Sequence, residues 1–223
     1  MESKIIIMLT HNDQTVPNAL EVFRSCQDLP VEFWGFKDVG LELSGMKKVI
    51  EAMKQAGKTT FLEVVSYSEE ECMAGAKTAV SLGFDYLMGT VYHKSVFDYL
   101  KTQPIKFLPF CGQVYGSPSV LEGSIDEVIK DAEGLLDKGV DGIDLLAFRH
   151  KEGARLAEEF CRRVSKQVVI AGSINSPERI AFINQINPWG FTMGSALFTK
   201  NFAPDESFRE NLEVVISCMS SLK

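Results

Sequence analysis

The sequence lacks the features that mark secreted, disulfide-rich or membrane-embedded proteins. Its cysteines are widely scattered and form no C-x-x-C pair and no zinc-like spacing with histidine, which predicts reduced thiols. They are Cys26, Cys72, Cys111, Cys161 and Cys218. The apolar run at Ile5–Leu9 is too short for a signal peptide or a membrane span. We therefore expect a cytoplasmic protein with no membrane partner.

Positive charge is also scarce. Lysine and arginine number 23 against 30 acidic residues, which gives a net charge of -7 and a pI of about 5.1. An acidic surface repels nucleic acid, so we expect no nucleic-acid partner. A small anionic metabolite still fits, because backbone N–H groups at helix starts attract anions locally. This composition is compatible with a homo-oligomer and leaves the oligomeric state open.

What the chain does contain is an alternation of short apolar runs with longer amphipathic stretches. With 223 residues, 45% of them hydrophobic, it can bury a large core, and no composition break divides it, so we expect one domain over residues 1–223. The predicted strands are Ile5–Leu9, Val31–Phe36, Thr60–Val65, Tyr86–Met88, Lys106–Phe110, Gly142–Ala147, Val168–Ala171 and Gly190–Met193. The predicted helices are Pro17–Ser25, Leu43–Ala56, Glu69–Leu82, Ser95–Lys101, Ile125–Lys138, Glu152–Val164, Pro177–Ile183 and Glu206–Met219.

Eight strand–helix units fit either an open, doubly wound sheet or a closed barrel. The turn after the first strand, residues 10–15, lacks the glycine-rich dinucleotide fingerprint of the doubly wound folds. The number of units and their regular spacing favour the barrel. We therefore predict an α/β fold of the single-domain (β/α)8, or TIM, barrel type. Residues 111–123, rich in Gly, Ser and Pro, are predicted as a long loop after the fifth strand.

The last two strands each run into a turn of small residues, 171–174 (AGSI) and 193–196 (MGSA). Glycine lets the backbone approach a ligand, serine adds a hydroxyl, and the start of a helix directs N–H groups at an anion. Barrel enzymes hold phosphate groups in these same two turns. The alternative is a pair of ordinary tight turns. We predict a site for the phosphate of a small phosphorylated metabolite, formed by Gly172, Ser173, Gly194 and Ser195.

Through residues 171–174 and 190–198, the chain resembles the ribulose-phosphate-binding barrel superfamily. That superfamily includes isomerases and lyases of histidine and tryptophan biosynthesis and the phosphosugar epimerases. The resemblance is specific over the last quarter of the chain and topological elsewhere. It implies a barrel whose two glycine turns hold the substrate phosphate. It does not extend to the reaction, because the Asp-x-Lys-x-x-Asp motif of the related decarboxylases and the metal-binding histidine–aspartate pairs of the epimerases are absent.

Charged residues lie within, or directly after, three of the apolar strands. Lys37 follows the second strand, where it could form an imine, donate a proton or pair with Asp38 in solvent. Glu63 lies within the third strand, and its carboxyl must face the barrel interior or mouth because the other face packs on helices. It is a candidate general base or the buried partner of Lys37. Asp144 holds the equivalent position in the sixth strand.

Other polar residues follow the strand ends. Asp13, after the first strand, is a candidate acid or base, although aspartate is also common in turns. The three histidines, His11, His93 and His150, lie just beyond strand ends and could transfer protons near neutral pH. No carboxylate–histidine spacing requires a metal ion and no pattern calls for another cofactor, so we predict neither, although three metal ligands from separate strands would leave no such spacing.

Together these features predict an enzyme that isomerises, epimerises or cleaves a small phosphorylated sugar or related carbonyl compound. The candidate catalytic residues are Lys37, Glu63, Asp13 and Asp144. The rival interpretation is a non-catalytic sensor of a phosphorylated metabolite, similar to the glycerol-phosphate-responsive barrels. Convergence of Lys37, Glu63 and Asp144 in one cleft favours the enzyme, and dispersal favours the sensor.

Overall fold

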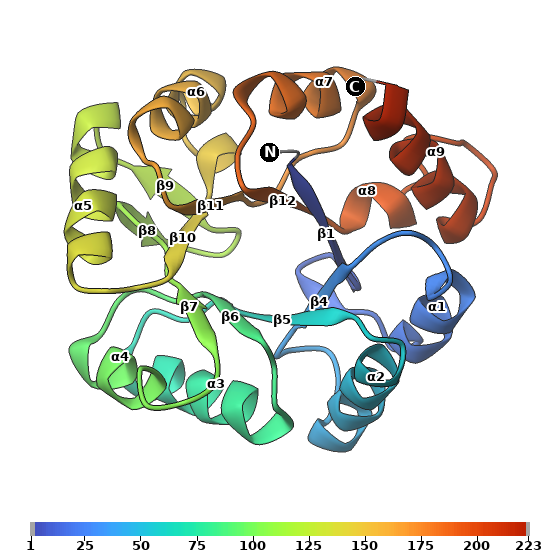
Figure 1. The fold of residues 1–223 in the computed structure, drawn as a ribbon, viewed down its shortest axis with the longest axis horizontal. Coiled ribbons are helices and arrows are strands. Elements are labelled where there is room, and N and C mark those ends of the chain that lie inside the picture. Colours follow the sequence, from blue (N-terminus) through green and yellow to red (C-terminus); the bar gives the residue numbers. More distant parts are fainter. Residues whose placement is uncertain (1–2, 222–223) are drawn as a thin grey trace.

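The computed structural model describes residues 3–221 and shows eight parallel strands arranged in a ring, with the helices outside it (Figure 1). The barrel strands are β1 (Lys4–Met8), β4 (Phe33–Lys37), β5 (Thr59–Val64), β6 (Tyr86–Gly89), β7 (Lys106–Leu108), β10 (Gly142–Leu145), β11 (Gln167–Ile170) and β12 (Gly190–Met193). Each matches a predicted strand to within two residues at either end. The fold is therefore the predicted (β/α)8 barrel.

The strands follow the order β10-β11-β12-β1-β4-β5-β6-β7, so only the join between β7 and β10 remains to close the ring. That join is sparse. The Asp144 N–H donates to the Pro109 carbonyl at 3.0 Å, and the Asp141 N–H donates to the Phe107 carbonyl at 3.1 Å. A carboxylate oxygen of Asp141 accepts from the Phe107 N–H at 2.9 Å. The barrel is thus nearly closed, and the Asp141 side chain supplies one of the few hydrogen bonds between β7 and β10.

Three of the helices begin at a serine that caps them. Ser68 accepts a hydrogen bond from the Glu71 N–H, and Ser124 forms a capping box with Glu127. Ser176 caps a helix that has proline in its first turn. The helices are α1 (Ala19–Cys26), α2 (Leu43–Gln55), α3 (Glu69–Leu82), α4 (Lys94–Leu100), α5 (Ile125–Asp137), α6 (Gly153–Arg163), α7 (Pro177–Ile186), α8 (Ser195–Phe198) and α9 (Phe208–Ser221). A 3₁₀ turn, Ala147–Arg149, follows β10.

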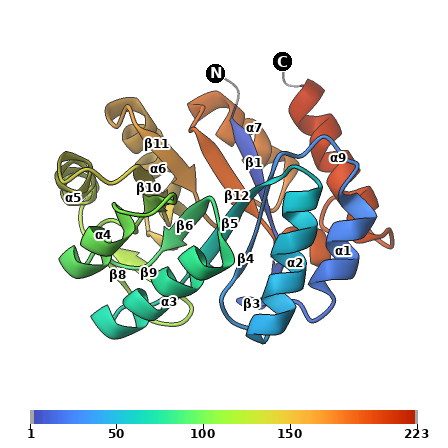
Figure 2. The same cartoon turned by 60° about the horizontal axis from the view of Figure 1, so that its bottom comes forward.

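Two predicted irregular segments are in fact β-hairpins. Residues 10–15 form β2 (Thr10–His11) and β3 (Gln14–Thr15), joined by Asn12 and Asp13, which both have positive φ as a type I′ turn requires. The predicted loop at 111–123 contains β8 (Gln113–Tyr115) and β9 (Val120–Glu122). Both hairpins lie at the end of the barrel where the parallel strands finish (Figure 2).

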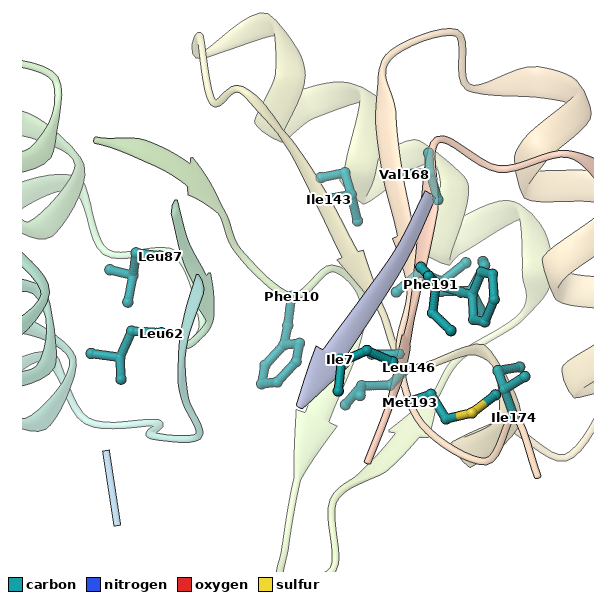
Figure 3. Close-up of a cluster of buried hydrophobic side chains, with 14 of the residues drawn as sticks. Ile7, Leu62, Leu87, Phe110, Ile143, Leu146, Val168, Ile174, Phe191 and Met193 are labelled. Carbon is teal, nitrogen blue, oxygen red and sulfur yellow. The ribbon is translucent and has the colours of Figure 1, made fainter. Parts of the chain in front are cut away.

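Successive side chains of a strand point to opposite faces of the barrel wall, and this divides the core into two parts. One side of each strand packs against the surrounding helices, as Ile7, Leu62, Leu87 and Phe191 do in Figure 3. The other side fills the barrel interior, where Phe61 stacks on Tyr86 with ring centroids 4.3 Å apart. Burying one such large apolar side chain contributes roughly 1.5–3 kcal/mol. This apolar layer fills the barrel interior below the side chains at the mouth.

Candidate functional site

A pocket of about 280 Å³ lies at the mouth of the barrel. Seven of the eight predicted site residues line it, namely Asp13, Lys37, Glu63, Gly172, Ser173, Gly194 and Ser195. Its walls come from the ends of β1, β4, β5, β11 and β12 and from the segments that follow them. The β8–β9 hairpin contributes Ser119 to the wall. The pocket therefore contains both the candidate phosphate turns and the candidate acid/base residues.

Strand register brings Lys37 and Glu63 together. They are direct partners in the β4–β5 ladder, so both side chains emerge on the interior face. Lys37 Nζ lies 3.8 Å from Glu63 Oε1 and 3.0 Å from Asp13 Oδ1. Thr15 fixes the hairpin against β4, because its hydroxyl accepts from the Lys37 N–H at 2.9 Å and donates to the Lys37 carbonyl at 2.7 Å. Asp38, the alternative partner of Lys37, lines a separate hollow.

The pKa of Lys37 lies above its ordinary value. Burial alone would lower that pKa, but the charges of Glu63 and Asp13 and the hydrogen bond to Asp13 raise it. Burial likewise favours protonation of Asp13, yet the hydrogen bond and charge of Lys37 lower the pKa of that carboxyl. At neutral pH the pair is therefore an ammonium and a carboxylate. Only 11% of the Lys37 side chain is exposed, against 55% of Asp13.

Glu63 and Asp144 respond mainly to burial. Burial raises the pKa of Glu63, opposed by the nearby charge of Lys37. Asp144 is fully buried behind the pocket and does not line it. Burial, strengthened by the charge of Glu63, raises the pKa of Asp144 well above its ordinary value. Because burial holds the pKa of Asp144 well above its ordinary value, we assign it as a neutral acid.

The turn after β11 has the conformation expected of a ligand-binding loop. Gly172 and Ser173 both have positive φ, +77° and +60°. A Cβ built on Gly172 would meet only Arg149 Nε, at 3.9 Å, so this glycine faces the pocket and serves the backbone conformation. The Gly172 N–H is already taken, because it donates to Thr192 Oγ1 at 3.1 Å. Any phosphate contact in this turn must therefore use later groups, such as the Ser173 hydroxyl.

Gly194, after β12, has a different reason to be glycine. A Cβ at this position would lie 2.9 Å from the backbone oxygens of Met8 and Thr10, which is closer than real side chains approach. Gly194 is thus required where β12 packs beside β1. The short helix α8 begins at the next residue, Ser195. The Leu197 N–H donates to the Gly194 carbonyl at 2.9 Å, which leaves the Ser195 and Ala196 N–H groups of the first turn without a partner inside the helix.

Arg149 is the site residue that sequence reasoning missed. It ends the 3₁₀ turn after β10, lines the pocket and lies beside Gly172. It forms no ion pair with any residue in the 3–221 range, yet its charge lowers the pKa of Asp13 and Glu63. An unpaired guanidinium beside a glycine turn suits a phosphate group. The only sequence signal was its position just beyond a strand end.

The histidines lie outside the pocket walls. His93 Nε2 lies 3.0 Å from the Tyr67 carbonyl, and His150 Nε2 lies 2.9 Å from the Gly123 carbonyl. His150 also accepts from the Glu152 N–H through Nδ1 at 3.1 Å. The His11 ring centroid is 5.8 Å from that of Phe198. Two of the three therefore contact backbone carbonyls of neighbouring loops, and none of them lines the pocket.

Two features are absent from the part of the chain that the structure describes. No group of three or more His, Cys, Asp or Glu side chains there is arranged to hold a metal ion. No helix there combines the length and apolar character needed to cross a bilayer.

Comparisons with known proteins identify the fold and no family. No family model and no curated protein matches the sequence. Among solved structures, orotidine 5'-phosphate decarboxylase from Pyrococcus horikoshii is similar with a TM-score of 0.73 and 12% identity, over 97% of this chain and 99% of that one. A protein described as native KDPGal is similar with a TM-score of 0.70 and 13% identity, over 100% of this chain and 98% of that one. Tryptophan synthase from M. tuberculosis is similar with a TM-score of 0.68 and 12% identity, over 100% of this chain and 94% of that one. At such identities the likeness shows the barrel fold alone.

Proposed function

We propose that this protein is an enzyme of the ribulose-phosphate-binding barrel type, acting on a small phosphorylated sugar or related carbonyl compound. The observation that carries the proposal is a single pocket of about 280 Å³ lined by Lys37, Glu63, Arg149 and both glycine turns. A volume near the lower limit of ordinary small-molecule sites suits a compact metabolite. The five unpaired cysteines suit a cytoplasmic enzyme.

The phosphate group binds beside Arg149. Its oxygens accept hydrogen bonds from the guanidinium, from the Ser173 and Ser195 hydroxyls and from the first turn of α8. This anchoring holds the carbon skeleton over β4 and β5, where Lys37 and Glu63 emerge. Phosphate binding thereby supplies the orientation that the chemical step needs.

The chemical step is a proton transfer next to a carbonyl group. The Glu63 carboxylate takes the proton from the carbon, and the electron pair of the C–H bond moves to the carbonyl oxygen. The Lys37 ammonium donates a hydrogen bond to the resulting enolate oxygen. Return of the proton to the other face of the same carbon gives epimerisation, and its return to the neighbouring carbon, with a proton shift between the two oxygens, gives isomerisation. Carbon–carbon cleavage uses the same enolate: Glu63 takes a proton from a β-hydroxyl group, the O–H electron pair forms the new carbonyl, and the pair of the breaking C–C bond moves to the carbonyl oxygen that faces Lys37. Asp144 keeps a proton behind Glu63, and Asp13 holds the ammonium in place.

An ammonium role for Lys37 is favoured over an imine. A lysine that attacks a carbonyl must be neutral, and enzymes achieve this by lowering its pKa. Here the surrounding carboxyl groups raise the pKa of Lys37 instead, despite the opposing effect of burial. The ammonium therefore persists in the free protein.

Two considerations support an enzyme over a sensor. Lys37 and Glu63 meet in one cleft, and Asp144 is buried behind it, close enough to Glu63 for the charge of that carboxylate to raise the pKa of Asp144. The named substrate of the orotidine 5'-phosphate decarboxylase is also a phosphate ester, which shows that this fold accommodates such compounds. A sensor does not need the largely buried Lys37–Glu63 pair or a buried carboxyl group behind it, and burying such groups destabilises the fold.

Thermal unfolding tests the proposal. Phosphorylated sugars are compared with their unphosphorylated parents, for the wild type and for Arg149→Gln, with Arg155→Gln as the matched control because Arg155 pairs only with exposed Glu152 on α6. We expect phosphorylated compounds alone to raise the melting temperature, since a ligand at a hundred times its Kd stabilises by about 2.7 kcal/mol. Arg149→Gln should weaken binding roughly 10- to 100-fold. Stabilisation by no phosphorylated compound would overturn the proposal.

A further inference from the structure

The charged side chains of the pocket are divided between its two ends. Arg149 lies at the phosphate end, beside Gly172 after β11. Lys37 lies at the end of β4, which β12 and β1 separate from β11 in the ring. The phosphate end thus offers an unpaired cation. The reacting end holds one ammonium that already contacts two carboxyl groups, at 3.0 and 3.8 Å.

Resting on the proposed function, we infer that the site takes a sugar monophosphate whose reacting end is uncharged, and that Asp13 makes it reject the corresponding carboxylate. The inference names a substrate class, the aldose or ketose monophosphates. It excludes their oxidised counterparts, the aldonate phosphates and other phosphorylated carboxylic acids.

Hydrogen-bond capacity at Lys37 favours an uncharged partner. An ammonium has three N–H donors, and one of them is used by Asp13 at 3.0 Å. Glu63 Oε1, at 3.8 Å, lies outside hydrogen-bond distance. Up to two donors therefore remain for a carbonyl and a neighbouring hydroxyl oxygen. A neutral carbonyl accepts these bonds without disturbing the ion pair.

A substrate carboxylate meets the opposite situation. It would compete with Asp13 for the same ammonium and face two carboxyl groups, while Arg149, the other cation of the pocket wall, is occupied by the phosphate in the proposed binding mode. Burial favours the neutral form of Asp13, but Lys37 holds the pKa of that carboxyl below its ordinary value, so Asp13 stays charged at neutral pH. Like-charge repulsion of this kind is a usual basis of rejection. Asp13 is the better residue to test than Glu63, because its side chain is 55% exposed and tolerates substitution.

Matched pairs of ligands test the inference directly. The probes are glyceraldehyde 3-phosphate with 3-phosphoglycerate, erythrose 4-phosphate with 4-phosphoerythronate, ribose 5-phosphate with 5-phosphoribonate, and glucose 6-phosphate with 6-phosphogluconate. The members of each pair share carbon number and phosphate and differ only at C1. Dissociation constants are measured by calorimetry at pH 7.5 for the wild type and Asp13→Asn. Asp137→Asn is the control, an exposed aspartate at the end of α5.

For the chain length that fits, we expect the aldose phosphate to bind at least about 10-fold tighter than its aldonate. Asp13→Asn should reduce that ratio at least 10-fold, mainly by tightening the aldonate, and Asp137→Asn should leave it unchanged. An aldonate phosphate that binds as tightly as its aldose, or a ratio that Asp13→Asn does not alter, would overturn the inference while leaving phosphate anchoring intact. Binding of neither member of any pair would instead overturn the proposed function.

Discussion

Lys37 Nζ lies 3.0 Å from Asp13 Oδ1, an ion pair between the end of β4 and the turn of the β2–β3 hairpin. A hairpin that follows β1 thereby contributes a charged group to the neighbouring strand. The Thr15 hydroxyl reinforces this contact with two hydrogen bonds to the Lys37 backbone. The position of the ammonium is therefore set by two segments, and substitutions at Lys37 are the most direct test of the site.

Lys37→Met should lower kcat/KM roughly 10²- to 10³-fold with the best phosphorylated substrate, since it removes the cation that faces the enolate oxygen. Borohydride added during turnover should leave the mass of Lys37 unchanged, because the raised pKa of this lysine keeps it protonated. Steady-state kinetics and mass spectrometry of the peptide check both points. A borohydride-dependent mass increase at Lys37 would show that an imine forms.

Glu63 should set the acid limb of the pH–rate profile. A general base must be deprotonated, and burial raises the pKa of Glu63, so kcat/KM should fall as pH decreases through a value above the ordinary glutamate pKa of about 4.3. Glu63→Gln should lower kcat/KM roughly 10²- to 10⁴-fold. The profile is measured between pH 4 and 9. A limb at or below pH 4.3 would contradict the assignment.

Asp144→Asn should stabilise the fold at neutral pH. The pKa of Asp144 is raised in the folded state, so the native protein keeps a proton that the unfolded chain releases. The free energy of unfolding therefore decreases as pH rises above about 4, by about 1.4 kcal/mol per pH unit, until the folded-state pKa is reached. Urea unfolding should show the variant equal to the wild type near pH 4 and more stable at pH 7. Asp137→Asn, an exposed change, should not show this divergence.

The two turn glycines should separate binding from folding. Gly194→Ala places a Cβ 2.9 Å from two backbone oxygens, so it should lower the free energy of unfolding by several times the effect of Gly172→Ala. Gly172→Ala meets only Arg149 Nε, at 3.9 Å, and costs only about 1–2 kcal/mol for its positive φ. Urea unfolding measures the free energy of unfolding of both variants. The phosphate affinity of Gly172→Ala is compared with that of the wild type. Equal destabilisation would contradict the packing role of Gly194.

Much of this arrangement could be predicted from the sequence because it follows from periodicity. Apolar runs located all eight strands, and the two-residue repeat of a strand placed Glu63 and Asp144 on the interior face. Periodicity does not give the depth of a residue along the barrel axis, which depends on how the strands are staggered. Glu63 consequently reaches the pocket, whereas Asp144 stays buried behind it.

The features that were missed arise in short, irregular segments. The type I′ turn at Asn12 and Asp13 lacks the glycine that usually signals such hairpins, so residues 10–15 were interpreted as a plain turn. Arg149 points toward Gly172 from a 3₁₀ turn, which has no repeat long enough to show its direction in the sequence. The bond from the Gly172 N–H to Thr192 Oγ1 joins two strands, and no local pattern encodes it.

The sparse join between β7 and β10 has a consequence for how the molecule loosens. Local opening of a protein begins where few backbone hydrogen bonds hold a segment, so amide exchange should be fastest along this join. The phosphate turns and the Lys37–Glu63 pair belong to β11, β12, β4 and β5, which with β1 form an uninterrupted run that continues into β10, the strand before Arg149. Separation of β7 from β10 would therefore leave the proposed phosphate ligands and the proposed base on one continuous sheet.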